Sequence, residues 1–335
     1  MNVALCPEHI DILSLCTGGA GLDLGVELAI PSARTVCMVE REAFAVAHLV
    51  SAMEQGLLHP APIWSDARTF DGRAWRGCVD GLIGGIPCQP HSLAGKRLGG
   101  GDERDLWSTA RRIIVQSGCW FVLIENVGGM LSSGGAERVW RDLRRLGFEV
   151  EGGLFTAEEV GDTQERERIF ILAVAATCRQ GLAGGQWPGP SRKRNWAPPS
   201  GSTAELCRAR LAEAVAPAWS DGRGARDEWD MATAAEGGRA FAPPPSGPVG
   251  LFPPYPEDLD GWRTVLDRAP LLEPAVRRVA DGLASELDAH RVDRIRMLGN
   301  GVVPVQAAHA LRTLATRLAA RGSVGANRLV RMMAE

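Results

Sequence analysis

The first half of the chain alternates short apolar runs with segments that carry helical spacing. The apolar runs are bounded by glycine, proline or charged residues, and they span residues 12–15, 35–39, 79–83, 120–124 and 169–174. Segments 22–29, 41–53, 105–117 and 137–146 lie between them and have helical periodicity. Strands that alternate with helices along a chain pair in parallel, because each helix provides the crossover. The sequence therefore predicts an α/β fold with a doubly wound, mostly parallel sheet.

The composition and periodicity of the sequence change after residue 177. Segments 186–201 and 242–256 are rich in proline and glycine, and the interval between them shows little periodicity. A regular pattern returns at residues 294–318, as a loop followed by a helix. We therefore expect a first domain over 10–176, a small irregular domain over 177–290, and a return segment over 291–321 that completes the first domain.

Charge and cysteine content limit the classes of protein to consider. The 335 residues carry a formal net charge of -3 at pH 7, so the surface is not uniformly basic. A nucleic-acid partner would have to meet a local arginine-rich cleft. The eight cysteines form no C-x-x-C pair and no zinc-like grouping with histidine. We therefore expect reduced thiols and no metal, and a monomeric protein. Because no segment resembles a membrane span or a signal peptide, we also expect the protein to be soluble and cytoplasmic.

A glycine-rich turn after the first expected strand indicates a nucleotide-like ligand. Residues 14–21 follow a strand and open a helix, and their glycines permit a tight turn and a close approach of backbone to ligand. Glu40 ends the second strand, about 20 residues later, where it can accept hydrogen bonds from a ribose diol. Neither G-x-G-x-x-G nor G-K-[ST] is present, so a ligand with a ribose and without a pyrophosphate fits better. S-adenosyl-L-methionine is such a ligand. Asp66, after the strand-like piece 63–65, could accept from its adenine amino group or merely cap a helix.

Cys88 stands in the sequence Pro87-Cys88-Gln89, after an apolar run and the turn Gly84-Gly85. A single cysteine in a protein of this kind is usually a small buried apolar side chain. At the edge of a sheet, however, its thiolate could act as a nucleophile. The glycine-rich stretch 95–101 that follows could be a lid over a substrate or an ordinary surface loop.

Five short motifs in a fixed order resemble those of the DNA cytosine-5 methyltransferases of bacteria and their phages. They are the segments 87–92 (PCQPHS), 95–96 (GK), 125–127 (ENV), 164–168 (QERER) and 299–304 (GNGVVP). The resemblance covers residues 12–174 and 294–318 and leaves out the middle of the chain. It implies a Rossmann-like methyltransferase sheet.

The resemblance also implies a reaction and the residues that carry it. Cys88 would attack C6 of a flipped-out cytosine, and C5 would take the methyl group of S-adenosyl-L-methionine. Glu125 would hold a proton at N3, for which it needs a raised pKa. Arg166 and Arg168 alternate on an expected strand, so both would point to one face and meet the base O2.

Further residues match the family's motifs at the cofactor and the DNA. The cofactor set comprises Leu15, Cys16, Gly18, Gly19, Gly21, Glu40, Asp66, Pro87 and Asn300, and the DNA and loop set comprises Gln89, Ser92, Lys96, Arg104 and Gln164. Asn300 would begin the turn that brings the last helix back against the catalytic strands. Ser14, Cys16 and Ala20 depart from the family's first motif, and Cys16 replaces an aromatic ring that would pack on adenine.

The region 177–290 occupies the place of the family's target recognition domain, which implies double-stranded DNA as partner and a possible companion restriction enzyme. Two other functions stay open. The chain could methylate transfer RNA, as one branch of the family does, although the Pro-Cys-Gln step and the size of the insert favour DNA. It could also be a catalytically silent DNA-binding relative, although Cys88, Glu125, Arg166 and Arg168 are all present. The target sequence does not follow from these motifs.

Overall fold

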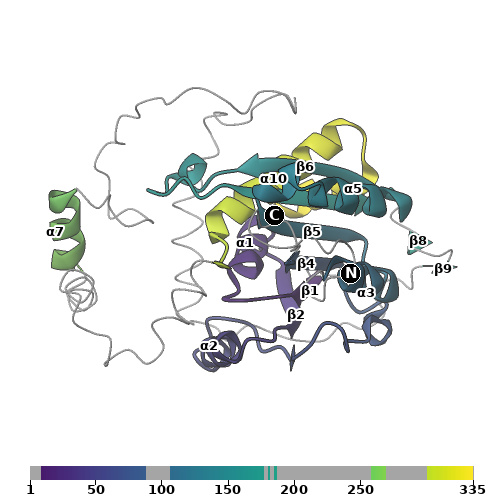
Figure 1. Cartoon of the computed structure of the whole chain (residues 1–335), viewed down its shortest axis with the longest axis horizontal. Coiled ribbons are helices and arrows are strands. Elements are labelled where there is room, and N and C mark those ends of the chain that lie inside the picture. The colour runs from purple at the N-terminus through teal and green to yellow at the C-terminus, as the bar shows by residue number, and fades with distance from the viewer. Residues whose placement is uncertain are drawn as a thin grey trace, which may run out of the picture.

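A seven-stranded sheet forms the centre of the protein (Figure 1). The computed structural model describes residues 9–87, 106–176, 180–181, 185–186, 258–268 and 300–334. The strand order is β3-β2-β1-β4-β5-β7-β6. The strands are β1 (Ile10–Leu15), β2 (Ala33–Val39), β3 (Ile63–Trp64), β4 (Gly81–Gly85), β5 (Phe121–Val127), β6 (Phe148–Phe155) and β7 (Arg168–Ala175). Neighbouring strands from β3 to β5 pair in parallel, and β7 is antiparallel to both β5 and β6. The expected mostly parallel α/β sheet is confirmed.

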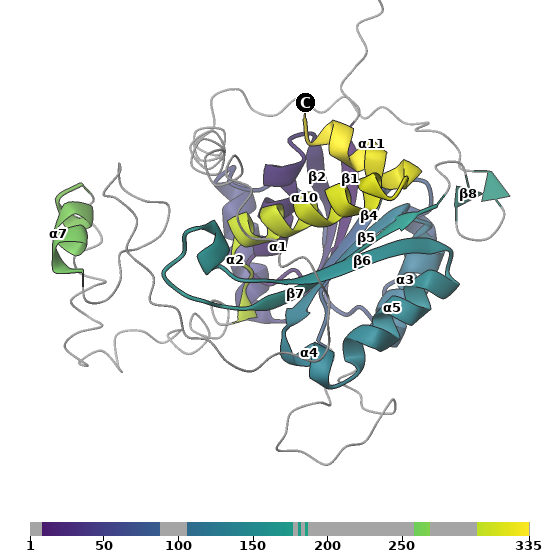
Figure 2. The ribbon, with the colours of Figure 1, turned by 90° about the horizontal axis from the view of Figure 1, so that it is seen from above.

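Helices cover both faces of the sheet (Figure 2). The long helix α10 (Pro304–Ala320) packs on α1 (Gly21–Ala29), and α11 (Val324–Met332) packs on α10. On the opposite face lie α3 (Trp107–Ser117) and α5 (Gly135–Arg145). The remaining described elements are α2 (Ala43–Glu54), η1 (Gly72–Trp75), α4 (Gly129–Ser132), η3 (Glu158–Val160), β8 (Gln180–Gly181), β9 (Gly185–Gln186) and α7 (Leu259–Arg268). Among the described helices, none combines the length and the apolar character that crossing a membrane requires.

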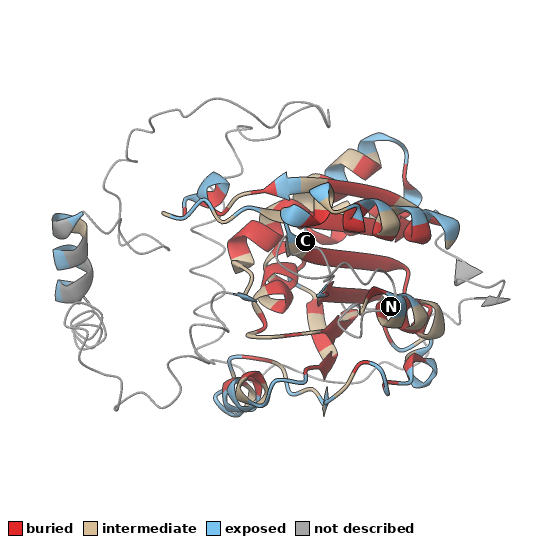
Figure 3. Cartoon of the chain, viewed as in Figure 1, coloured by how far each residue is buried: buried red, intermediate tan, exposed pale blue. Residues whose placement is uncertain are grey.

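The core follows the central strands, which Figure 3 shows as almost continuously buried. In β5, residues 121–124 are at most 1% exposed, as expected for a strand covered on both faces. Strand β6 is the one long strand of the sheet that the apolar pattern did not predict. Its sequence FEVEGGLF interrupts the apolar run with two glutamates and two glycines. Packing explains one of the glycines, because a Cβ at Gly152 would lie 2.7 Å from the Trp140 ring.

Close contact between α1 and α10 depends on two glycines of α1. A Cβ at Gly25 would lie 2.5 Å from the Cβ of Ala307, and a Cβ at Gly21 would overlap the carbonyl oxygen of Val302. Packing of the return segment therefore requires a glycine at position 21, which the sequence pattern did not reveal. In this way α10 is brought against the start of α1, next to the glycine-rich turn.

Candidate active site

A cavity of about 590 Å³ opens at the carboxyl ends of the parallel strands, the usual place for ligands in an open α/β sheet. Its lining includes residues 14–19 at the end of β1, residue 40 after β2, residues 85–87 at the end of β4, residues 125–127 of β5 and residues 300–302 before α10. Because β7 runs antiparallel to β5, its first residue pairs with the last residue of β5. Arg168 thereby reaches the same cavity. Strands distant in sequence thus deliver their end residues to one site.

The glycine-rich turn contains three residues in the left-handed region of φ. Gly18 has a φ of 57°, and the non-glycine residues Cys16 and Ala20 have φ values of 53° and 62°. A left-handed backbone at a non-glycine residue costs about 1–3 kcal/mol and persists only where the surroundings enforce it. The Val39 carbonyl accepts from Cys16 N at 2.8 Å, and the Thr17 carbonyl accepts from Ala20 N at 3.0 Å. Cys16 and Ala20 therefore adopt backbone conformations that glycine usually occupies in a turn.

Glu40 organises this turn from the end of β2. It is 7% exposed, and its Oε2 accepts from the backbone N of Gly18 at 2.7 Å. Its Oε1 accepts from the backbone N of Arg41 and of Glu42 at 2.7 and 2.8 Å. A carboxylate offers about four lone-pair sites. With three in use, Glu40 keeps the capacity to accept one hydrogen bond from a ribose hydroxyl.

Asp23 is a buried carboxyl beside the cavity that the sequence analysis did not single out. It accepts from Thr35 Oγ1 at 2.7 Å and from Ser14 Oγ at 3.1 Å, and Ser14 Oγ in turn accepts from Thr17 Oγ1 at 3.0 Å. Burial raises the pKa of Asp23 to about 6, against the lowering by its hydrogen bonds from Thr35 and Ser14. The only signal in the sequence is one acidic residue within the otherwise apolar start of α1. Asp23 therefore connects β1, β2 and the glycine-rich turn through hydrogen bonds.

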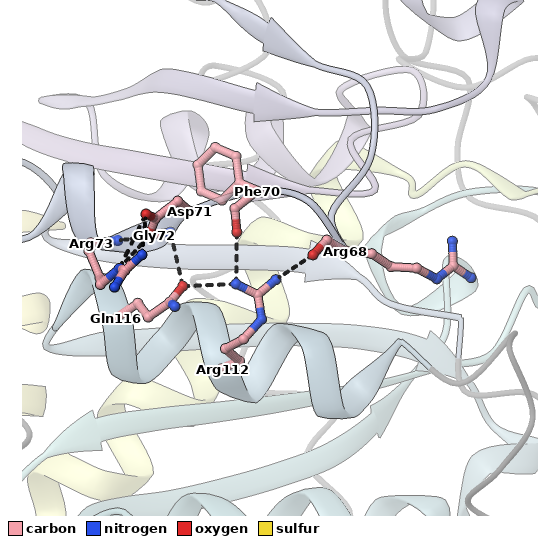
Figure 4. Close-up of polar contacts among 7 residues, drawn as sticks. All are labelled: Arg68, Phe70, Asp71, Gly72, Arg73, Arg112 and Gln116. Carbon is pink, nitrogen blue, oxygen red and sulfur yellow. Dashed lines mark hydrogen bonds and ion pairs between the residues drawn. The ribbon is translucent and has the colours of Figure 1, made fainter.

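Asp66 is not among the described residues that line the cavity. Its Oδ1 accepts from the backbone N of Arg68 at 2.9 Å, which closes a local turn and matches the capping role more closely than a ligand contact. Arg112 of α3 fastens this turn by donating to the carbonyls of Phe70, Ala67 and Arg68 at 2.8, 3.0 and 3.1 Å. Figure 4 shows the guanidinium between α3 and the turn. The turn is held rigidly, with Asp66 engaged in its own segment.

Glu125 and Arg168 form an ion pair in the cavity wall. Arg168 Nε lies 3.1 Å from Glu125 Oε1, and the two side chains are only 14% and 7% exposed. Burial raises the pKa of Glu125 to about 7, although the positive charges of Arg168 and Arg166 act in the opposite direction. A carboxyl with such a pKa exchanges a proton readily near neutral pH. Glu125 therefore has the property that a general acid at this position needs.

The expectation that Arg166 and Arg168 share a strand is wrong. Strand β7 begins at Arg168, and Arg166 lies before it with a φ of 34°, which breaks the two-residue alternation of a strand. The Arg166 guanidinium donates to the carbonyl of Gly301, in the segment that leads into α10. Its charge still reaches Glu125, since it contributes to lowering the pKa of that carboxyl. Arg168 thus lines the cavity and pairs with Glu125, whereas Arg166 bonds to the segment before α10 and affects Glu125 through its charge.

Asn126 has a structural role that its place in the motif 125–127 did not reveal. Its Nδ2 donates to the carbonyl of Ile86 at 2.7 Å, and its Oδ1 accepts from the backbone N of Val127 at 2.8 Å. Ile86 and Pro87 both line the cavity and lead directly to Cys88. Asn126 therefore fixes the end of β4 against the end of β5, immediately before the expected nucleophile.

The other expected site residues divide into three groups. Lining the cavity are Leu15, Cys16, Gly18, Gly19, Gly21, Glu40, Pro87, Glu125, Arg168 and Asn300. Gln164 is exposed, and its backbone N donates to Asp162 Oδ1 at 3.2 Å. Outside the described residues are Cys88, Gln89, Ser92, Lys96 and Arg104, together with most of the region 177–290.

The family model described as "C-5 cytosine-specific DNA methylase" matches residues 10–197 of this chain. The chain belongs to this family. The resemblance that the ordered motifs indicated is thus confirmed, and the matched range contains the glycine-rich turn, Glu125 and both arginines. It ends before most of the region expected to recognise a target.

Relatives of this chain include bacterial type II methyltransferases. The chain is 31% identical over 189 residues to the type II methyltransferase M.NgoMIV of Neisseria gonorrhoeae, covering 54% of this chain and 56% of that protein. It is 29% identical over 170 residues to M.NaeI of Lentzea aerocolonigenes, covering 50% and 40%. Among solved structures, it is similar to the Dnmt2 methyltransferase of S. pombe with 22% identity, a TM-score of 0.41 and coverage of 51% and 53%. The matches span about half the length of the curated relatives.

Proposed function

We propose that this protein transfers a methyl group from S-adenosyl-L-methionine to C5 of cytosine in double-stranded DNA. The observation that carries the proposal is the buried Glu125, with a pKa of about 7 and paired with Arg168, in the same cavity as the glycine-rich turn. One cavity thus combines an acid that exchanges protons near neutrality with a turn suited to a ribose-bearing ligand. Family membership supports the same reaction.

Cys88 is the proposed nucleophile, since it directly follows Pro87 in the sequence and Pro87 lines this cavity. Its thiolate would form a bond to C6 of cytosine. The C5=C6 electrons would move to the C4–C5 bond, the C4=N3 electrons to N3, and Glu125 would give N3 its proton. The positive charge of Arg168 would then stabilise the Glu125 carboxylate that remains. After C5 has taken the methyl group, N3 would return its proton to Glu125. Loss of the C5 proton to solvent and departure of the Cys88 sulfur as a thiolate would then restore the aromatic ring.

The residues at the glycine-rich turn fit S-adenosyl-L-methionine. Glu40 retains one acceptor site for a ribose hydroxyl, and the turn at residues 16–19 presents backbone to the cavity. When bound, this cofactor supplies the electrophilic methyl group that C5 takes. Asp66 is left out of the proposed contacts, because its carboxylate closes its own turn.

The buried position of Glu125 has a consequence for the substrate. A cytosine stacked in a duplex cannot bring its N3 to a carboxyl that is 7% exposed in a cavity wall. The target base would therefore have to leave the helix, at a cost of a few kcal/mol for unstacking and unpairing. Recognition of the flanking bases would fall to residues in the region 177–290.

The direct test is methyl transfer to duplex DNA and to transfer RNA by the purified chain with labelled S-adenosyl-L-methionine, followed by bisulfite sequencing of the product. Label at C5 of cytosine in DNA, absent in Cys88→Ala, is expected. Cys78→Ala is the matched control, because Cys78 is an exposed thiol outside the cavity lining. Methylation confined to RNA would overturn the DNA assignment, and full activity of Cys88→Ala would overturn the mechanism.

A further inference from the structure

Gln306, the third residue of α10, makes an unusual pair of contacts. Its side chain is completely buried, and its Nε2 donates to the carbonyls of Phe155 at 2.8 Å and Arg166 at 2.9 Å. Its Oε1 has no hydrogen-bond partner among the described residues. Exchanging the amide nitrogen and oxygen would place the oxygen against two carbonyl oxygens, so the observed orientation is forced. The buried Gln306 amide therefore donates to two carbonyls, while its oxygen accepts no hydrogen bond from the described residues.

One of those carbonyls belongs to a residue with an unfavourable backbone. Arg166 has a φ of 34°, a region that residues with a side chain adopt only when their surroundings hold them there. Gln306 holds its carbonyl, and the carbonyl of Gly301 holds its guanidinium. The preceding residue is also fixed, since the Glu165 carbonyl accepts from Ala157 N at 2.9 Å. Gln306 in α10 and Gly301 just before α10 therefore fix Arg166 at its backbone carbonyl and at its guanidinium, respectively.

We propose that Gln306 is a positioning residue for Arg168, and that it acts through the backbone of Arg166. Two residues further along, Arg168 begins β7 and places Nε 3.1 Å from Glu125 Oε1. Relaxation of Arg166 to a right-handed backbone would turn the chain that enters β7 and displace that guanidinium from Glu125. The inference rests on the function proposed for Glu125 and Arg168. It adds a residue, 140 positions beyond Arg166 in the sequence, that sets their geometry.

The test replaces Gln306 by methionine, which has similar length and volume but cannot donate to either carbonyl. We expect kcat for cytosine methylation to fall about 10- to 100-fold, as is typical when a catalytic group moves by about 1 Å. The dissociation constant for S-adenosyl-L-methionine, measured by calorimetry, should stay within about twofold of the wild-type value, because the cofactor turn is untouched. Gln306→Leu serves as a second variant if methionine packs poorly.

Arg312→Met is the matched control. Arg312 lies on the same helix and donates to the carbonyls of Leu28 and Ala29, so its loss also removes bonds from α10 to backbone carbonyls. It should lower the melting temperature while kcat, referred to folded protein, stays near wild type. An equal fall of kcat in Arg312→Met, or wild-type kcat in folded Gln306→Met, would overturn the inference. Absence of turnover in the wild type would instead reject the proposed function, and the inference with it.

Discussion

Replacing Glu125 by glutamine should abolish proton transfer while preserving the shape of the cavity wall. Glutamine has nearly the same volume and can still accept a hydrogen bond from Arg168, which lies 3.1 Å from the carboxylate. Its amide can donate to N3 of cytosine but cannot give up a proton. A positioned general acid contributes about 10²- to 10⁴-fold to rate, so we expect Glu125→Gln to lose at least about 10²-fold in kcat near pH 7.

The size of this loss should depend on pH in a way set by burial. Glu125 has a pKa of about 7, so about half of the wild-type molecules hold the proton at pH 7 and about 1% at pH 9. Cys88 is common to both enzymes, so its titration cancels in the ratio of their rates. The ratio of wild-type to Glu125→Gln activity should therefore fall about tenfold per pH unit above pH 7. It should be constant below about pH 6.

Single-turnover methylation of duplex DNA, measured from pH 6 to 9, is the assay. Glu151→Gln is the control, since Glu151 is also a buried carboxylate, 6% exposed and paired with Arg321 at 2.6 Å, but on β6 outside the cavity lining. It should change stability and leave the rate and its pH dependence near wild type. A wild-type to Glu125→Gln ratio that is small, or that does not vary with pH, would refute the general-acid role.

Three further changes test the support of the site. Gly21→Ala should lower the melting temperature and weaken cofactor binding at least about tenfold in calorimetry, because its Cβ overlaps the Val302 carbonyl. Burial gives Asp23 a pKa of about 6 instead of 3.8. Its contribution to the free energy of unfolding is therefore fully present below pH 3.8 and is lost as the pH rises through 6. In urea unfolding, the free energy of unfolding of Asp23→Asn should vary with pH by up to about 3 kcal/mol less than that of the wild type. Arg112→Leu, which frees three carbonyls, should lower the free energy of unfolding by about 1–3 kcal/mol.

The sequence predicted what depends on local pattern. Apolar runs identified β1, β2, β4, β5 and β7, because a strand buried on both faces reads as a continuous apolar segment. Strand β6 was missed, since it mixes glutamates and glycines whose fit comes from Trp140 and Arg321, neither of which the pattern reveals. Spacing likewise cannot show whether a backbone is left-handed.

The same limit explains the outcome at the site. Glu40 directly follows β2, and Glu125 lies near the carboxyl end of β5. Because the carboxyl ends of parallel strands meet at one edge of a sheet, both residues line the cavity. Arg166 was placed on a strand because alternate arginines suggest one, whereas contacts from Gln306 and Gly301 hold it in another conformation. Asp23 and Gln306 act through partners that are distant in sequence and close in space. The acidic residue in the apolar start of α1 is a weak local signal for Asp23, and the sequence analysis found none for Gln306.

The central claim is that Cys88 attacks cytosine C6 in a cavity where Glu125 supplies the proton. Incubation with S-adenosyl-L-methionine and a duplex in which cytosines are replaced by 5-fluorocytosine tests it most directly, because fluorine at C5 cannot leave as a proton does. Mass spectrometry of the digested complex should find one methylated 5-fluorocytosine adduct on the peptide that contains Cys88. A duplex that is turned over without an adduct, or an adduct on another residue that persists in Cys88→Ala, would contradict it.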